Sequence, residues 1–279
     1  MFIPCFDSRI KGLDLHAHQQ EIVEPDERVH FFSDAHLDSE KDSRTLEREQ
    51  RVIAFLEQLR TEADVLVILG DLFDFYFEYK TVLPARHLRV MAGIEALARS
   101  GVRCWYVAGN HDFWLGELFS RTLGVRLVPD SLLLIRETDP PLRVLALHGD
   151  GLGEGDTGYK ILKKCLRNRL LIRLFRLLHP DWGYALARFT SRTSRKYTAN
   201  RQAARVEASA DTARKLLASC RELDTVILAH THQPEKREFE HGLYLNSGDW
   251  CTHFSYIKWS AAGFELKSFD YPPKSKTVA

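Results

Sequence analysis

The chain has 279 residues, 44% of them hydrophobic, which suggests one or two domains with a sizeable core. Its formal net charge is only +1, which excludes a global polycation or polyanion. The five cysteines are scattered, odd in number and never spaced as CxxC, which favours free thiols in a reducing compartment over a disulfide framework or a zinc ribbon. Charged residues stand where a signal peptide needs an apolar core, and no run of about 18 apolar residues occurs, so we expect a cytoplasmic protein without a spanning helix.

Short apolar strands alternate with amphipathic helices along the chain. Residues 1–27 are weakly patterned, and the sequence does not reveal their role. In chain order, the pattern then predicts a strand at 29–33, a helix at 44–60, a strand at 65–69, a helix at 84–101, a strand at 104–108, two short strands within 125–136, a strand at 143–147, a helical basic segment at 156–219, a strand at 225–229 and a tail of strands and turns at 244–269. This alternation argues for a layered α/β fold, and the β-rich tail suggests a second sheet packed on the first.

The predicted strand at 65–69 ends in Gly70 and Asp71. The glycine turns the chain sharply and leaves the carboxylate at the C-terminal end of a buried strand, which is the edge where ligands bind in open α/β sheets. A single strand-end Asp or His is more often a cap or a satisfied polar residue. The same arrangement recurs at four further predicted strand ends, and that recurrence carries the argument.

The strand-end side chains form a set of two carboxylates, one amide and four imidazoles, all able to bind a divalent cation. They are Asp34, His36, Asp71, Asn110, His148, His230 and His232. Hard oxygens mixed with imidazole suit Mn²⁺, Fe²⁺ or Zn²⁺ and disfavour a structural zinc site. Seven ligands are too many for one ion with an open position, but they suit two ions that share a bridging carboxylate, an arrangement that hydrolyses phosphoesters.

The motifs DAH, GDLFD, GNHD, HGD and HTH, in this order and spacing between Asp34 and His232, resemble the calcineurin-type metallophosphoesterase superfamily. The resemblance implies an α/β fold built as a two-sheet sandwich flanked by helices, with layers α/β/β/α. It also implies two metal ions. The first would be held by Asp34, His36 and His232, the second by Asn110, His148 and His230, with Asp71 as the bridge.

The GNHD motif supplies two further candidates. By the resemblance, His111 is the acid near the leaving oxygen, and Asp112 orients it. The chain departs from the general pattern at Ala229, where a glycine usually precedes HxH; one added methyl group leaves the ligands intact.

Other classes of protein compete with this interpretation. The stretch DLHAH, with His16 and His18, resembles the opening of amidohydrolase barrels, but no apolar strand precedes it and the chain is too short for eight βα units. We expect these two histidines on the surface. A non-catalytic scaffold with the same fold is a further alternative, which the complete ligand set disfavours.

Two stretches bear on the substrate. Five aromatic residues follow the bridging acid in GDLFDFYFEYK, and we expect core packing for about half of them. Residues 160–201 contain twelve lysines and arginines but one acid, Asp181, interleaved with leucines and aromatics. Such a segment can lie on an anionic membrane surface, or it can cover the core from outside. Nucleic acid is a further possibility, because the local positive charge would also attract phosphates. It is not expected as a partner, since no aromatic stacking motif accompanies a polar groove here.

The whole chain is most similar to the UDP-2,3-diacylglucosamine diphosphatases of bacterial lipid A synthesis. The similarity lies in GDLFD, in HGD with acidic and tyrosine residues beyond it, in a helical insertion before the last strand, and in HTHxP. It implies one domain at 28–279, after an extension at 1–27, with an insertion at about 156–200 that caps the site and holds acyl chains. It further implies two ions, usually Mn²⁺, with Fe²⁺ or Zn²⁺ as alternatives. The substrate contacts that it implies are Asp156, Tyr159, Ser194 and Arg195.

The reaction that this similarity implies is hydrolysis of a lipid-linked nucleotide sugar at its pyrophosphate bond. The products would be UMP and 2,3-diacylglucosamine 1-phosphate, and the enzyme would associate peripherally with the inner membrane through its basic segment. The better-known branch of the family often reads GNRD where this chain has GNHD. A metallophosphoesterase acting on a soluble nucleotide or a phosphoprotein is the alternative activity.

Overall fold

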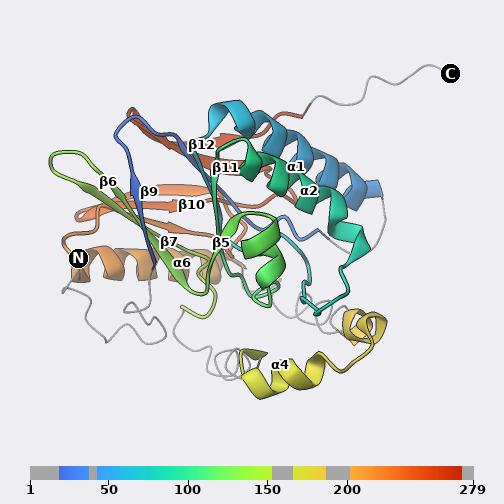
Figure 1. Cartoon of the computed structure of the whole chain (residues 1–279). Coiled ribbons are helices and arrows are strands. Elements are labelled where there is room, and N and C mark those ends of the chain that lie inside the picture. Colours follow the sequence, from blue (N-terminus) through green and yellow to red (C-terminus); the bar gives the residue numbers. More distant parts are fainter. Residues whose placement is uncertain (1–18, 38–42, 153–165, 187–201, 272–279) are drawn as a thin grey trace.

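Two six-stranded sheets pack face to face in the computed structural model, and helices cover both outer sides (Figure 1). The structure describes residues 19–37, 43–152, 166–186 and 202–271. This is the two-sheet sandwich that the sequence predicts.

The first sheet combines the N-terminal strand of the domain with five strands from later in the chain. Its strands, in spatial order, are β1 (Gln19–Val23), β6 (Ser131–Arg136), β7 (Leu142–Leu147), β8 (Thr225–Leu228), β10 (Gly242–Asn246) and β9 (Glu235–Phe239). The strands β7, β8 and β10 run parallel, so their C-terminal ends meet at one edge. Sequence patterning missed β9 because its burial is intermediate or low along its whole length.

The second sheet contains the strands that precede three of the ligand motifs. In spatial order it consists of β12 (Gly263–Ser268), β11 (Ser255–Ser260), β2 (Val29–Phe32), β3 (Val65–Ile68), β4 (Arg103–Val107) and β5 (Val125–Val128). The four strands from β2 to β5 are parallel. Their buried, almost wholly apolar sequences fit a parallel sheet that is covered on both faces.

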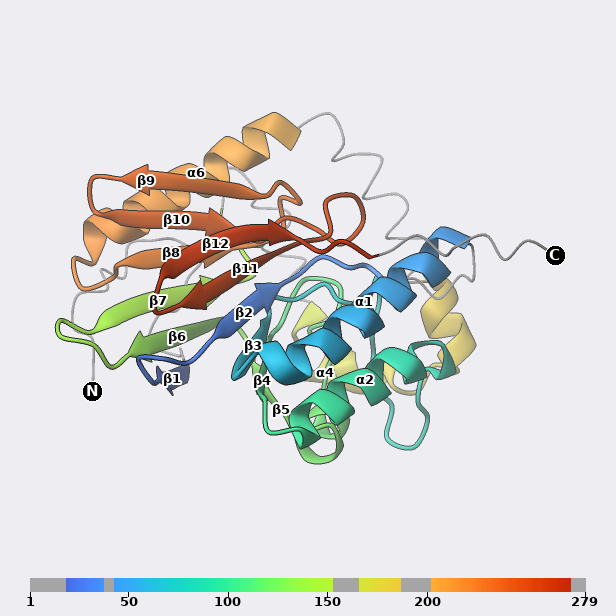
Figure 2. The same ribbon diagram turned by 90° about the horizontal axis from the view of Figure 1, so that it is seen from above.

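Three helices complete the layers. Helices α1 (Ser43–Glu62) and α2 (Leu88–Arg99) lie together on one side of the sandwich, and α6 (Gln202–Ser219) lies on the other (Figure 2). The short η2 (Ala85–His87) and η3 (Leu118–Thr122) flank α2 and β5. Each helix buries one apolar stripe: in α1 it consists of Val52, Phe55, Leu56 and Leu59.

The N-terminal boundary of the domain lies earlier than predicted. Strand β1 falls within the stretch 1–27 that looked like an extension, yet it pairs in parallel with β6 along five residues. Hydrophobic patterning did not indicate this strand because its first three residues, Gln19, Gln20 and Glu21, are polar. Glu21 is buried nonetheless, because it forms ion pairs with Arg103 at 2.5 Å and Arg126 at 3.0 Å.

The cysteines follow the prediction only in part. Cys104 and Cys251 are free thiols, as expected. Cys220 is fully buried and disulfide-bonded, so the prediction of free thiols throughout is wrong at this position. The cysteine pattern therefore no longer supports a reducing compartment.

The described part of the predicted lid, residues 166–186, projects from the sandwich and includes α4 (Arg169–Phe175) (Figure 1). An aromatic cluster attaches it: the Phe175 ring stacks on Trp114 with centroids 5.6 Å apart and contacts Phe77 at 4.7 Å. Trp114 Nε1 also donates a hydrogen bond to the Leu166 carbonyl at 3.1 Å. Within the described ranges, no helix is both long and apolar enough to span a bilayer.

Buried His30 on β2 should make the fold sensitive to acid. Neither ring nitrogen has a hydrogen-bond partner in the described structure, and burial lowers the pKa of His30 to about 4, with a smaller contribution from Lys258. The unfolded state binds a proton below about pH 6.5, whereas the folded state does not until about pH 4. Stability is therefore present above pH 6.5 and falls by up to about 3 kcal/mol across that window. In urea unfolding at pH 7 and pH 4.5, we expect His30→Leu to lose much less stability on acidification than the natural chain; an equal loss would contradict this assignment.

Candidate metal centre

Five of the seven predicted ligands stand in left-handed backbone turns directly after their strands. Their φ angles are 54° for Asp34, 41° for His36, 53° for Asp71, 66° for His230 and 60° for His232. This conformation costs non-glycine residues of the order of 1–3 kcal/mol each and is retained at functional sites. Here the turns direct donor atoms from both sheets toward one edge.

Two glycines let the central loops approach each other. A Cβ on Gly109 would lie 2.1 Å from Asp71 Oδ1, and a Cβ on Gly70, whose φ is +79°, would lie 2.6 Å from the Gly109 backbone. A larger residue at Gly109 would therefore displace Asp71, and a larger residue at Gly70 would push away the Gly109 backbone. The glycines of the Gly70–Asp71 and Gly109–Asn110 pairs are thus required because no larger side chain fits between the two loops.

The first ligand group consists of Asp34, His36 and His232, whose ligand atoms all lie within 4.8 Å of one another. Asp34 Oδ2 accepts hydrogen bonds from Ser33 Oγ at 2.5 Å and from the His230 backbone at 3.1 Å. Asp34 Oδ1 is buried without a hydrogen-bond partner in the described structure and lies 3.4 Å from His232 Nε2. The Nε2 atoms of His36 and His232 face each other at 3.2 Å. An unpartnered buried carboxylate oxygen between two imidazole nitrogens fits a divalent cation.

The second group consists of Asp71, His148 and His230, again within 4.8 Å. His148 Nδ1 donates to the Leu69 carbonyl at 2.7 Å, which leaves Nε2 to face the site. Around that Nε2 lie Asn110 Oδ1 at 3.1 Å, His230 Nδ1 at 3.2 Å and Asp71 Oδ2 at 3.4 Å. The four side chains predicted to bind or bridge the second ion are therefore together.

Asp71 lies between the two groups. Its Oδ2 is 3.4 Å from His148 Nε2 in the second group and 3.9 Å from His36 Nε2 in the first, while Oδ1 accepts from the His111 backbone at 2.9 Å. Burial raises the pKa of Asp71, but positive charge on His148 and His111 outweighs this and leaves the pKa well below its usual range. Burial lowers the pKa of His148, yet Asp71 raises it to about 10. The ionised Asp71 carboxylate is thus stabilised by a positive charge beside it. Either the protonated His148 ring or a bound metal ion can provide that charge.

Two residues that sequence reasoning missed support the first group. Asp249 Oδ2 lies 3.5 Å from His232 Nδ1, while its Oδ1 accepts from the backbones of Thr252 and His253, each at 2.9 Å. A carboxylate behind a ligand histidine fixes the ring orientation. Its signal was present, because Gly248–Asp249 follows β10 as Gly70–Asp71 follows β3. Arg48 on α1 donates to the carbonyls of both Ala35 and His36 at 3.0 Å and so holds the strained turn.

His111 lies at the rim of both groups, with its side chain 21% exposed. Its Nδ1 donates to the Asp74 carbonyl at 2.7 Å, and its Nε2 points to the site, 4.0 Å from Asp71 Oδ2. The ring packs edge-on against His36 with centroids 4.8 Å apart.

Asp112 does not orient His111, so that prediction is wrong. Its carboxylate accepts from the backbones of Gly109 and Asp71, each at 3.2 Å, from Phe73 at 3.3 Å and from the Tyr106 hydroxyl. Burial raises the pKa of Asp112 to about 6, and the neighbouring Asp71 charge adds to this. Asp112 therefore holds the two central loops together, and the Asp74 carbonyl holds the His111 ring.

The remaining predicted positions lie outside the described residues. They are the substrate contacts Asp156, Tyr159, Ser194 and Arg195 and the decoy histidines His16 and His18. Of the five aromatic residues after Asp71, Phe73 and Tyr76 pack in the core, which agrees with the predicted half. Phe77 and Tyr79 are also buried, in the aromatic cluster beneath the lid, where Phe75 is half-buried.

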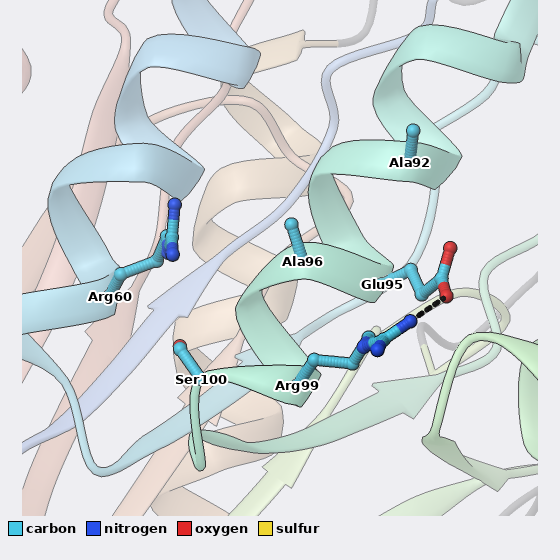
Figure 3. Close-up of a pocket in the computed structure, with 6 residues that line it drawn as sticks. All are labelled: Arg60, Ala92, Glu95, Ala96, Arg99 and Ser100. Atoms are coloured by element: carbon cyan, nitrogen blue, oxygen red, sulfur yellow. Dashed lines mark hydrogen bonds and ion pairs between the residues drawn. The ribbon is translucent and has the colours of Figure 1, made fainter.

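A groove of about 370 Å³ lies elsewhere, between α1 and α2 on the outer helical layer (Figure 3). Its two arginines are each paired within their own helix, Arg60 with Glu57 at 2.7 Å and Arg99 with Glu95 at 3.5 Å. No candidate ligand lines it. It is therefore not part of the metal centre.

Comparison with known proteins agrees with this geometry. The family model described as calcineurin-like phosphoesterase matches residues 27–234. A protein of Porphyromonas gingivalis named UDP-2,3-diacylglucosamine hydrolase is 29% identical over 265 residues, which covers 87% of this chain and 98% of the relative. A protein of Proteus mirabilis with the same name is 30% identical over 254 residues, covering 86% and 98%. The solved phosphoesterase Yfce from E. coli is similar with a TM-score of 0.40 and 16% identity, covering 84% of this chain and 88% of that one. Because the family model matches more than half of the chain, the chain belongs to the calcineurin-like phosphoesterase family.

Proposed function

We propose that the protein hydrolyses the pyrophosphate bond of UDP-2,3-diacylglucosamine and releases UMP and 2,3-diacylglucosamine 1-phosphate. The observation that carries this proposal is the convergence of all seven ligand-type side chains at one edge of the two-sheet sandwich, in a chain similar over most of its length to proteins named for that substrate. The seven positions span both sheets, so their meeting depends on the whole fold.

We infer the following ligand roles. Asp34, His36 and His232 hold one divalent ion, and Asn110, His148 and His230 hold the other, with Asp71 between them. The donor set of carboxylate, amide and imidazole fits Mn²⁺, Fe²⁺ or Zn²⁺, and we propose Mn²⁺. When bound, such ions activate water and neutralise charge on phosphate oxygens.

The other side chains of the site assist the hydrolysis in two ways, by proton donation and by positioning the ligands. Water adds to the α-phosphorus, the bond to the bridging oxygen breaks, and that oxygen leaves with the β-phosphate of the acylated sugar phosphate. His111 Nε2 faces the site while its Nδ1 remains bonded to the Asp74 carbonyl. In its imidazolium form, with a hydrogen on both nitrogens, the ring donates the Nε2 proton to the leaving oxygen without reorienting and is left as neutral imidazole. Asp249 and Arg48 keep His232 and the Asp34–His36 turn in position.

The direct test is incubation of the purified, Mn²⁺-loaded protein with the acylated UDP-sugar, with UMP measured by chromatography. We expect UMP release, its loss on chelation and its recovery with Mn²⁺. UDP-N-acetylglucosamine serves as the control without acyl chains and should react much more slowly. Equal rates would favour the alternative of a phosphoesterase for soluble nucleotides. No hydrolysis of either would favour a non-catalytic scaffold.

The lid supports the lipid part of the proposal. Leu170, Leu174, Leu177 and Trp182 are exposed in the described part of the lid, with Leu177 82% and Trp182 71% exposed. Basic residues lie among them. Such a surface fits an anionic membrane, and we propose peripheral association with the inner membrane there. Asp156, Tyr159, Ser194 and Arg195 remain our proposed contacts to sugar and phosphates.

Membrane binding by the lid can be measured separately from catalysis. Arg173→Gln with Arg176→Gln should lower sedimentation with anionic vesicles at low salt, because each cation adds about 1 kcal/mol of attraction near the surface. Leu174→Ser with Trp182→Ser should lower it at all salt concentrations, since each buried methylene adds about 0.8 kcal/mol. The control is Ile22→Ser, which changes an exposed apolar residue on β1, outside the lid. Unchanged sedimentation of the lid variants would mean that the lid does not bind membranes.

A further inference from the structure

Arg205 is a cation without an acidic partner at the edge of the metal centre. It lies in the first turn of α6, and its Nη2 atom is 2.6 Å from His230 Nε2. No carboxylate in the described structure pairs with it. Arg214 on the same helix differs, because it forms an ion pair with Asp211 at 2.5 Å. The free charge at this position therefore calls for a function.

The position of Arg205 is fixed by the helix that carries it. Helix α6 buries Ala213, Leu216 and Leu217 against the first sheet. At its first turn, the Gln202 side-chain amide donates to the Thr231 carbonyl, next to His230. The backbone of Arg205 is thus held beside the HTH motif.

The contact between Arg205 and His230 is incompatible with cation binding by His230. A guanidinium nitrogen only donates, so His230 Nε2 accepts from it. A neutral imidazole has a single acceptor nitrogen, and it is His230 Nδ1 that faces His148 at 3.2 Å in the second ligand group. If Nδ1 binds a cation, Nε2 must carry the hydrogen and can no longer accept from Arg205. The guanidinium then has unused donors next to the centre.

We propose that Arg205 leaves His230 when a cation is bound and then binds a phosphate group of the substrate beside the second ion. The planar fork of a guanidinium matches two phosphate oxygens, and the resulting charge-assisted hydrogen bonds are among the strong ones. This deepens the proposed function and depends on it for the identity of the phosphate compound. Binding of a phosphate anion as such does not depend on it.

The test is calorimetric titration of the Mn²⁺-loaded protein with inorganic phosphate, combined with elemental analysis of bound Mn²⁺. We expect Arg205→Gln to weaken phosphate binding about tenfold or more while its Mn²⁺ content equals that of the natural chain. Arg205→Lys, which keeps the charge but loses the fork, should fall between the two. Arg214→Gln on the same helix is the matched control and should bind phosphate normally.

Three results would overturn the proposal. Phosphate affinity of Arg205→Gln could equal that of the natural chain, or the loaded natural chain could fail to bind phosphate. Loss of Mn²⁺ from both Arg205 variants would show instead that Arg205 only positions His230. Because the titration requires no turnover, a protein that binds phosphate through Arg205 but leaves the acylated UDP-sugar intact would refute only the proposed substrate.

Discussion

Replacing His111 by alanine should lower turnover by about 10²–10⁴-fold, the range for loss of a general acid. The reason is its position: His111 Nε2 faces the centre while Nδ1 is bonded to the Asp74 carbonyl, and the ring lies 21% exposed at the rim. We expect kcat to fall because the lost interaction acts on the leaving oxygen. The measurement is steady-state hydrolysis by His111→Ala and by the natural chain, each loaded with Mn²⁺.

Metal content separates this role from ligation. His111→Ala should retain as much Mn²⁺ as the natural chain, since both ligand groups that we assign to ions are complete without it. His241→Ala, in the turn between β9 and β10 at the far end of those strands, is the matched control and should be fully active. If His111→Ala loses Mn²⁺ in proportion to its activity, His111 is a ligand and our assignment is wrong.

Replacing Asp71 by asparagine should have the largest effect on metal binding. The substitution keeps the size of the side chain but removes the negative charge that lies between both groups, 3.4 Å from His148 and 3.9 Å from His36. Loss of an outer-shell partner costs about 10–100-fold in metal affinity, and loss of the shared carboxylate should exceed this. We therefore expect Asp71→Asn to lose both ions on dialysis and to show no measurable hydrolysis.

Asp64→Asn is the matched control for that experiment. Asp64 precedes the same strand, β3, but at its opposite end, where it pairs with Arg28 at 2.9 Å. This variant should keep both ions and its activity. Normal Mn²⁺ content in Asp71→Asn would contradict a bridging role for Asp71.

The sequence was sufficient to bring the candidate ligands together because each of them follows a buried strand. In a parallel sheet, residues just after neighbouring strands must meet at one edge, so Asp34, Asp71 and Asn110 could be brought together from their order alone. His148 and His230 follow strands of the other sheet. Grouping them with Asn110 and Asp71 around one ion required the resemblance to a known family. Sequence order alone does not state how two sheets face each other.

Side-chain contacts within the site were less predictable. Asp112 follows His111 in the chain and was expected to orient it, yet its carboxylate turns inward to the backbones of Asp71 and Gly109. The His111 ring is instead bonded to the main-chain carbonyl of Asp74. Every residue has such a carbonyl, so the sequence gives no signal for this contact. Arg205 was missed because it contacts a histidine on another element and matches no motif of its own. Asp249 does have a signal in the sequence, since it follows a glycine after β10 as Asp71 follows Gly70 after β3.

Hydrolysis in ¹⁸O-labelled water tests the central claim most directly. The Mn²⁺-loaded protein is incubated with UDP-2,3-diacylglucosamine, and both products are analysed by mass spectrometry. Our account predicts one ¹⁸O atom in UMP and none in 2,3-diacylglucosamine 1-phosphate, because water adds to the α-phosphorus. Label in the acylated sugar phosphate, or UMP release that continues after complete removal of metal, would contradict it.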